Sequence, residues 1–527
     1  MKKTNRVISR LLFTTLLLAG FISIVAQTIS SGEIDSLVEK TMKTFDVPGI
    51  AVAVVKDDKV IHSRGYGVRS LNTKLKVDEN TLFAIASNSK AFTSAALGIL
   101  VDEKKLSWDD KVIDYIPEFR LYSPYVTEEF RIRDLLTHRS GLGLGAGDLM
   151  IWPGLNDFTL KDIIHNLRYL KPVSSFRTKY DYDNLMFIVA GEVVARASGM
   201  RWEDFVETRI MKPLNMTASA AAYSRLKDKS NVIDPHAPVN GVVQVIDRDF
   251  NFNEVGNAAG GIYSNITDMC KWIIMQMNDG RYGEGLKNRL FSEEVHREMW
   301  SPQTIIKVTN PTAYNTHFSS YGLGWFLSDV KGYKQVGHTG GLAGIVTQVT
   351  LIPELKLGII VFTNQQSGAA FNAISNTIKD RYFGIKGIDR VKQYRESETG
   401  AQNNAKKVTD EIWKNIGAQQ KNASISVNDT LFTGTYSDNW FGDAIISVKN
   451  GNLWFDSKRS MKLTGEMFAY KGTTFIVKWN DRSMDADAYV MFCLDKTGKA
   501  SGIKMEAISP LTDFSYDFQD LDFSRAK

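Results

Sequence analysis

A serine and a lysine three residues apart at the start of a helix can support acyl transfer, because both side chains then lie on one helix face, one turn apart. The helix N-terminus adds a field that favours negative charge on the serine oxygen. The Ser-x-x-Lys pattern begins at Ser87, Ser224, Ser328, Ser501 and Ser524, so the pattern alone has little specificity. Only Ser87 opens a long, mainly apolar stretch (SNSKAFTSAALGIL) that is typical of a buried helix. This context singles out Ser87 and Lys90 as the candidate reactive pair.

Two further short segments have residue types that suit such a site. The segment Tyr-Asp-Asn at 182–184 precedes LMFIVAGEVVARASG, a predicted helix, so we expect its side chains to project from a loop towards a cleft. The segment His-Thr-Gly-Gly at 338–341 ends a predicted strand, where main-chain N–H groups can face a substrate. Together with Ser87, these segments supply a nucleophile, proton-transfer groups and hydrogen-bond donors.

In this order and near these separations, Ser-x-x-Lys, Tyr-x-Asn and His-Thr-Gly resemble the motifs of class C β-lactamases and penicillin-binding-protein-like serine hydrolases. That group includes DD-carboxypeptidases, D-aminopeptidases, esterases and acyltransferases. The phrases LLTHRSGL (135–142) and AAGGIYSNITDM (258–269) are also similar to those of the family. The resemblance covers about residues 30 to 385 and is specific for fold and mechanism, but not for substrate.

The resemblance implies a role for each matching residue. Ser87 would be the nucleophile, Lys90 its partner and Tyr182 a proton relay. The implied substrate-binding residues are Asn184, His338, Thr339 and Gly340, with Asn184 contacting the substrate or Lys90. The implied oxyanion-hole donors are the main-chain N–H groups of Ser87 and Gly341. Neighbouring cations lower the pKa of a buried lysine and also favour a tyrosine phenolate, so either Lys90 or Tyr182 can take the serine proton.

His338 is a departure from the family pattern, because β-lactamases and carboxypeptidases usually carry lysine there. A permanent cation suits a substrate carboxylate, whereas histidine is mostly neutral near pH 7. This difference favours an esterase, aminopeptidase or acyltransferase over an efficient β-lactamase. The other histidines show no paired ligand spacing, so we expect no metal and no cofactor. We expect His138 to be structural and the glycines at 141–147 to form a flexible loop near the cleft.

The order of predicted elements indicates an α/β (α+β) fold with two domains. Residues 27–386 begin and end with strand-like segments and have helices between them, which predicts an antiparallel sheet flanked by helices, with an inserted helical lobe. Residues 387–428 are rich in Lys, Glu, Gln, Asn and Ser, which indicates a linker, helical in part around EIWKNI. Residues 429–527 have short aromatic-rich strands and an Asn-Gly hairpin signal, which predict a small all-β, barrel-like domain.

The first 26 residues have the pattern of a signal peptide, with an uncleaved membrane anchor as the alternative. Basic residues precede an apolar run that ends at Ala26, and no acidic residue occurs before Glu33. Of the 64 basic residues, four lie in this leader, so 60 remain against 59 acidic ones after cleavage. This charge balance gives no support for a basic patch that would bind nucleic acid. The leader predicts a periplasmic or secreted protein without membrane insertion after cleavage.

These patterns predict an exported serine hydrolase that acts through an acyl-enzyme on small esters, amides or peptides containing D-residues. The alternatives are an acyltransferase that passes the acyl group to a small alcohol or amine, and a non-catalytic receptor of the penicillin-binding type. The expected partners are a small-molecule or short-peptide substrate and, in a homo-oligomer, further copies of the chain. The C-terminal domain resembles small lipocalin-like modules. It could cover the mouth of the site, support assembly, bind a ligand or only stabilise the protein.

Overall fold

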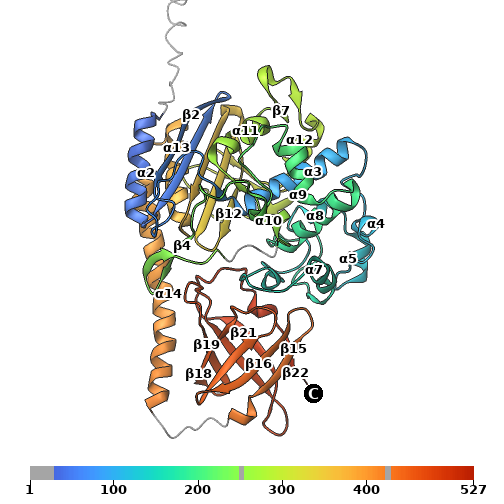
Figure 1. Cartoon of the computed structure of the whole chain (residues 1–527), viewed down its shortest axis with the longest axis vertical. Coiled ribbons are helices and arrows are strands. Elements are labelled where there is room, and N and C mark those ends of the chain that lie inside the picture. The colour runs from blue at the N-terminus through green and yellow to red at the C-terminus, as the bar shows by residue number, and fades with distance from the viewer. Residues whose placement is uncertain (1–28, 249–253, 422–428, 527) are drawn as a thin grey trace, which may run out of the picture.

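The computed structural model describes residues 29–248, 254–421 and 429–526. The predicted leader at 1–26 lies outside these ranges. No helix within them has the length and apolar content needed to cross a membrane. The described residues form a sheet-and-helix domain with a helical lobe on one side, and a β-barrel packed against one end of it (Figure 1).

The main sheet has eight strands in the order β2-β1-β14-β13-β12-β11-β10-β9, and every neighbouring pair is antiparallel. Its strands are β1 (Gly49–Lys56), β2 (Lys59–Gly67), β9 (Thr304–Ile306), β10 (Ser319–Tyr321), β11 (Phe326–Val330), β12 (Tyr333–Leu342), β13 (Ile345–Ile352) and β14 (Leu357–Thr363). Pairing of Ile50 with Thr363 joins the first hairpin of the domain to its last strand.

Strand β1 is covered on both faces, which explains its uninterrupted apolar sequence. Its residues 50, 52 and 54 pack in one apolar cluster with helices α2 (Ser31–Phe45) and α13 (Gly368–Tyr382). Its residues 51, 53 and 55 pack in the other cluster with α11 (Ile266–Met277), because successive side chains of a strand point to opposite faces. The sheet therefore lies between two helical layers.

The chain between β2 and β9 forms the helical lobe, whose centre is the contact between α3 (Ser89–Asp102) and α8 (Asn184–Ser198). Every residue of α3 from Ser89 to Leu100 is buried. The other helices of the lobe are α4 (Val112–Tyr115), α5 (Pro124–Glu129), α6 (Ile132–Leu135), α7 (Leu160–Asn166), α9 (Trp202–Val206), α10 (Asn257–Gly260) and α12 (Glu293–Met299). Short strand pairs join β3 (Phe83–Ala84) to β6 (Tyr263–Ser264), β4 (His236–Val239) to β5 (Val242–Val245), and β7 (Arg281–Tyr282) to β8 (Asn288–Arg289).

The C-terminal domain is a closed antiparallel barrel of eight strands. They are β15 (Gly434–Asp438), β16 (Gly442–Lys449), β17 (Asn452–Ser457), β18 (Thr464–Lys471), β19 (Thr474–Trp479), β20 (Ala488–Leu494), β21 (Ala500–Ala507) and β22 (Phe523–Arg525). Asn450 and Gly451 both have positive φ, as the predicted tight hairpin between β16 and β17 requires. Buried aromatic rings pack against one another inside the domain, Phe455 against Trp479 and Phe475 against Phe432 and Phe492.

Residues 387–428, expected to be a linker with a short helical part, contain the 32-residue helix α14 (Arg390–Lys421). Its first part packs on α13 and α2, and its last part packs on β18 of the barrel (Figure 1). Ile412 and Ile416 are buried there with Ile476 and Ile508. The segment is polar because most of the helix surface faces solvent, so a few widely spaced apolar residues suffice to attach both of its ends. At about 1.5 Å per residue, α14 is about 48 Å long.

The barrel also contacts the helical lobe directly. Arg459 pairs with Asp157 at 2.7 Å and Asp162 at 3.1 Å, and Asn156 forms a β-bridge with Ser460. The carboxylate of Asp517 accepts hydrogen bonds from the main-chain N–H groups of residues 147 and 149 at 2.6 and 3.0 Å. The barrel is therefore attached at two separate places, α14 on one side and the lobe on the other.

Candidate active site

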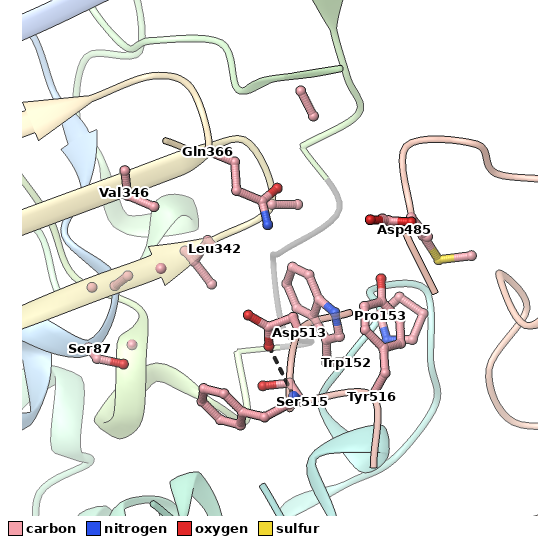
Figure 2. Close-up of a pocket in the computed structure, with 18 of the residues that line it drawn as sticks. Ser87, Trp152, Pro153, Leu342, Val346, Gln366, Asp485, Asp513, Ser515 and Tyr516 are labelled. Carbon is pink, nitrogen blue, oxygen red and sulfur yellow. Dashed lines mark hydrogen bonds between the residues drawn. The ribbon is translucent and has the colours of Figure 1, made fainter. Parts of the chain in front are cut away.

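Ser87 lies in the 3₁₀ turn η1 (Ala86–Asn88), which leads directly into α3. Ala86 has φ of +49°, a left-handed conformation that is uncommon for residues other than glycine. Ala86 and Asn88 are buried, whereas Ser87 is only half-buried and lines a cavity (Figure 2). This turn therefore presents the predicted nucleophile to the cavity at the start of the buried helix.

The side chain of Lys90 is fully buried one turn after Ser87. Its Nζ lies 3.0 Å from Ser87 Oγ, and it donates to Asn184 Oδ1 at 2.7 Å and to the carbonyl oxygen of Ala259 at 2.9 Å. Burial lowers the pKa of Lys90 to about 7, because removal from water penalises the charged form. A large fraction of Lys90 is thus neutral near pH 7 and able to accept the serine proton.

Tyr182 is buried beside the Lys90 amino group, which lies 4.8 Å from the centre of the Tyr182 ring. Burial raises the pKa of Tyr182 well above its ordinary value, and its hydrogen bond with Ser87 acts in the opposite direction. The phenol form therefore dominates near neutrality. This favours Lys90 as the proton acceptor, with Tyr182 as a hydrogen-bond donor and proton relay.

His138 lies against Tyr182, with the two ring centres 4.1 Å apart. Its Nδ1 accepts a hydrogen bond from the main-chain N–H of Asp183 at 3.0 Å, so the neutral ring carries its proton on Nε2. Burial and the nearby Lys90 hold the pKa of His138 well below its ordinary range. The sequence predicted a structural histidine. The structure places it beside the site, where it orients the loop that carries Tyr182.

Asp183 and Asn184 fix the start of α8. Asp183 caps the helix through the N–H groups of Leu185 and Met186 and also accepts from Ser140 Oγ. Asn184 accepts from Lys90 with Oδ1 and donates with Nδ2 to Asp148 Oδ2 at 2.8 Å. Of the two roles implied for Asn184, contact with Lys90 is therefore present in the structure.

Strand β12 brings the segment 338–341 to the nucleophile, and all four residues line the cavity. A Cβ at Gly340 would lie 2.4 Å from the carbonyl oxygen of Ile85 and 2.9 Å from the Cβ of Ala86. Glycine is therefore required for β12 to approach the turn that carries Ser87. A Cβ at Gly341 would meet no atom of the described residues within 4 Å, so this position borders open space. The oxyanion hole between the N–H groups of Ser87 and Gly341 stays a prediction.

His338 is buried and engaged within the protein at both ring nitrogens. Nδ1 donates to the carbonyl oxygen of Thr339 at 2.5 Å, so Nε2 is the acceptor for the hydroxyl of Tyr321 at 2.8 Å. Burial lowers the pKa of His338 to about 3, with Lys90 as a second cause. The residue is therefore neutral, as the sequence indicated, and neither ring nitrogen is free to contact a substrate.

A cavity of about 930 Å³ lies in front of Ser87, a size that suits a small molecule or short peptide. One wall comes from the lobe, including Trp152 and Pro153, and a second comes from the β4–β5 hairpin. The third wall comes from the barrel, including Asp485, Asp513 and Tyr516 (Figure 2). The barrel therefore contributes directly to the lining of the cavity. No group of three or more His, Cys, Asp or Glu residues in the described ranges could hold a metal ion.

Residues 34–380 match the Beta-lactamase family, and residues 426–525 match a domain of unknown function (DUF3471). Since the first match covers most of the chain, the chain belongs to the β-lactamase family of serine hydrolases, with a C-terminal DUF3471 domain that forms an eight-stranded barrel.

Among curated proteins, the chain is similar to Unguisins hydrolase ungD of Aspergillus violaceofuscus, with 28% identity over 379 residues, 68% of this chain and 66% of the relative. It is also similar to Protein flp of Staphylococcus aureus (strain COL), with 25% identity over 342 residues and 64% of each chain. The chain thus spans about two thirds of the length of these relatives. Among solved structures, an octameric penicillin-binding protein homologue from Pyrococcus abyssi matches with a TM-score of 0.58 and 20% identity, covering 94% of this chain and all of the other. This similarity confirms the predicted fold class.

The structure adds two groups of residues to those predicted. His138 and Asp148 lie beside the predicted residues, within the family-like phrase LLTHRSGL and just after the glycine-rich segment. The barrel residues 513–516 reach the same cavity. Nothing in the sequence placed His138 by the other motifs, and Asp148 had only the adjacent glycines at 141–147, which were expected to form a loop near the cleft. The second group had none, because only folding brings residues so distant in sequence to Ser87.

Proposed function

We propose that the protein is a serine hydrolase that forms an acyl-enzyme on Ser87 with small esters, amides or short peptides containing D-residues. The observation that carries the proposal is the 3.0 Å distance between Lys90 Nζ and Ser87 Oγ at a mainly apolar cavity. In the reaction, Lys90 takes the proton of Ser87 as its oxygen attacks the carbonyl carbon. The N–H groups of Ser87 and Gly341 then hold the oxyanion, and Tyr182 relays a proton to the leaving group.

The shape and charge of the cavity support a compact, uncharged reacting part of the substrate. The barrel wall limits the space in front of Ser87, and aromatic residues such as Trp152 and Phe514 offer apolar contact. His338 is neutral and places no cation beside the nucleophile. Relatives are named as hydrolases of unguisins, which supports hydrolysis in general and leaves the natural substrate of this chain to experiment.

Transfer of the acyl group to an alcohol or amine is the second candidate, because the acyl-enzyme is common to both reactions. The mainly apolar cavity favours acyl transfer to the extent that it restricts the access of water during deacylation. A receptor without catalysis is disfavoured by the intact contacts among Ser87, Lys90 and Asn184.

The test is covalent labelling followed by an activity screen. A fluorophosphonate probe should add once to the wild-type protein, on the peptide that contains Ser87, and Ser87→Ala should remain unlabelled. The screen compares p-nitrophenyl esters, D-aminoacyl anilides and nitrocefin, each with and without an added alcohol or amine. Release of free acid identifies a hydrolase, and acylated acceptor identifies a transferase. A probe adduct that persists in Ser87→Ala would contradict the proposal.

We also propose that the protein is exported to the periplasm or secreted. The support is the basic and then apolar leader at 1–26, which lies outside the described residues. Expression of the full chain in a Gram-negative host, followed by fractionation and N-terminal sequencing, should give a mature form that begins at Gln27. A membrane-bound form that retains Met1 would instead identify the leader as an anchor.

A further inference from the structure

A chain of hydrogen bonds connects the barrel to the buried lysine. Ser515, in the barrel loop that follows β21, donates its hydroxyl to Asp148 Oδ2 at 2.9 Å. Asn184 Nδ2 donates to the same oxygen at 2.8 Å, and Asn184 Oδ1 accepts from Lys90 Nζ at 2.7 Å. Asp148 is therefore two hydrogen bonds from the lysine that contacts Ser87, and a residue of the other domain holds it in place.

We propose that Asp148 is a positioning residue of the proton-transfer machinery, and that the barrel completes the active site by holding Asp148 through Ser515. This inference rests on the proposed function, because it assigns a role in acylation at Ser87. The barrel is then more than a cover for the cavity: its loop determines the position of Asn184 beside Lys90.

The barrel loop is itself fixed at several points. The main-chain N–H of Ser515 donates to Asp513 Oδ1 at 2.9 Å (Figure 2). Two residues further on, Asp517 accepts from the N–H groups on both sides of Asp148. The loop therefore holds both the main chain and the side chain of the turn that contains Asp148. A domain that served only as a cover would not need both of these attachments.

The carboxyl group of Asp148 lies among several titratable groups. Burial raises its pKa to about 8, and hydrogen bonds from Asn184 and Ser515 oppose this rise. Its other oxygen, Oδ1, is buried without a hydrogen-bond partner among the described residues. The groups that face Asp148 or Lys90 from the surrounding elements are Asp183, Asp517, His138, His338 and Tyr182.

Asp148 is the strongest of the influences that oppose the lowered pKa of Lys90, and Asp183 is the other. Because the pKa of Asp148 is itself raised to about 8, its carboxyl is mostly uncharged where Lys90 titrates, and its charge acts on Lys90 only at higher pH. In the range where Lys90 gains its proton, Asp148 therefore acts as the hydrogen-bond acceptor that holds Asn184.

Asp148→Asn is the conservative variant, because its amide oxygen can still accept from Asn184 and Ser515. It should keep kcat and the acid limb of kcat/KM against pH close to those of wild type, because Asp148 is mostly uncharged where that limb lies. Asp148→Ala removes the anchor of Asn184 and should lower kcat by about 10²-fold with little change in KM. Ser515→Ala should lower kcat about tenfold, and Ser515→Thr, which keeps the hydroxyl, should restore it.

Ser501→Ala is the matched control, because Ser501 is exposed on β21 and its hydroxyl donates to the carbonyl oxygen of Cys493 within the barrel. Fluorophosphonate labelling of the wild type separates the two proposals. An unlabelled wild type overturns both. A labelled wild type overturns this inference alone if Asp148→Ala and Ser515→Ala acylate at the wild-type rate, or if Asp148→Asn loses as much kcat as Asp148→Ala. If Ser515→Ala has a lowered melting temperature, the comparison of Asp148→Asn with Asp148→Ala still decides.

Discussion

The ring of Tyr182 lies on the ring of His138, with their centres 4.1 Å apart, and both rings are buried beside Lys90. His138 also accepts the main-chain N–H of the residue that follows Tyr182. The imidazole therefore holds Tyr182 in two ways, through contact between the two rings and through a hydrogen bond from the backbone of the next residue.

This relationship predicts different effects for two substitutions of His138. His138→Asn keeps a side-chain acceptor for the Asp183 N–H but loses the stacked ring, whereas His138→Ala loses both. The alanine variant should lose about 1–3 kcal/mol more stability than the asparagine variant, because it leaves a buried N–H without a partner. Both should acylate more slowly than wild type. Thermal unfolding and stopped-flow acylation measure the two effects, and equal stabilities would show that the Asp183 N–H finds another acceptor.

Lys90→Met should abolish efficient acylation, because the general base is removed while the buried volume is kept. The acylation rate should fall by about 10²–10⁴-fold, and Lys90→Met with Tyr182→Phe should be little worse than the worse single variant. In wild type, kcat/KM should fall as pH decreases through about 7, because Lys90 becomes protonated there. Fully additive losses would show that the two residues act independently.

Lys90→Met should also have a larger free energy of unfolding than wild type near neutral pH. The pKa of Lys90 is about 7 in the folded protein and about 10.4 in an unfolded chain, so the unfolded state binds more protons between these values. Wild-type stability therefore rises with pH across this interval. The advantage of Lys90→Met should be largest below pH 7 and should shrink towards pH 10. Urea unfolding at three pH values measures it, and an advantage that is independent of pH would contradict the lowered pKa.

Gly340→Ala and Gly341→Ala form a matched pair on β12. A methyl group at 340 would lie 2.4 Å from the carbonyl oxygen of Ile85, just before the η1 turn. It should therefore displace Ser87 and cost about 1–3 kcal/mol of stability. A methyl group at 341 borders open space and should leave the melting temperature unchanged. Differential scanning calorimetry and probe labelling test the pair. A normal labelling rate for Gly340→Ala would mean that the turn adjusts without moving the nucleophile.

His338→Lys should not convert the protein into an efficient β-lactamase. Both ring nitrogens of His338 form hydrogen bonds within the protein, one with the hydroxyl of Tyr321 and one with the carbonyl oxygen of Thr339. A lysine there would place a second cation near Lys90 and lower the pKa of Lys90 further. We expect similar changes in kcat/KM for nitrocefin and for a neutral ester between pH 6 and 9. A gain confined to nitrocefin would show that the new side chain reaches the substrate carboxylate.

The sequence located the parts of the site that follow local rules. Ser87 and Lys90 could be predicted because helix geometry alone places residues three apart on one face, and Asn450-Gly451 could be predicted because a tight hairpin needs positive φ. Helix α14 was predicted only in part, around EIWKNI, because its polar composition resembles that of an unstructured segment. Its attachment depends on Ile412 and Ile416, whose apolar partners lie in another domain.

Asp148 and Ser515 could not be paired from the sequence. Each residue alone is an ordinary polar residue in a loop, and neither has a pattern of neighbours that indicates a role. Their relationship exists only because α14 carries the chain away from the catalytic domain and the barrel then returns a loop to the cavity. Pairing of this kind depends on tertiary structure, which short-range periodicity does not encode.

The contact between Asp148 and Ser515 also bears on how this protein can change by recombination. A gene fusion that exchanged the barrel for that of a relative would bring in a new loop opposite the unchanged Asp148. Unless the incoming loop carried a donor at the same place, the hybrid would inherit a buried carboxylate that lacks one of its two donors. Across descendants of such proteins, the residue at 148 and the residue at 515 should therefore be inherited as a pair, although they belong to different domains.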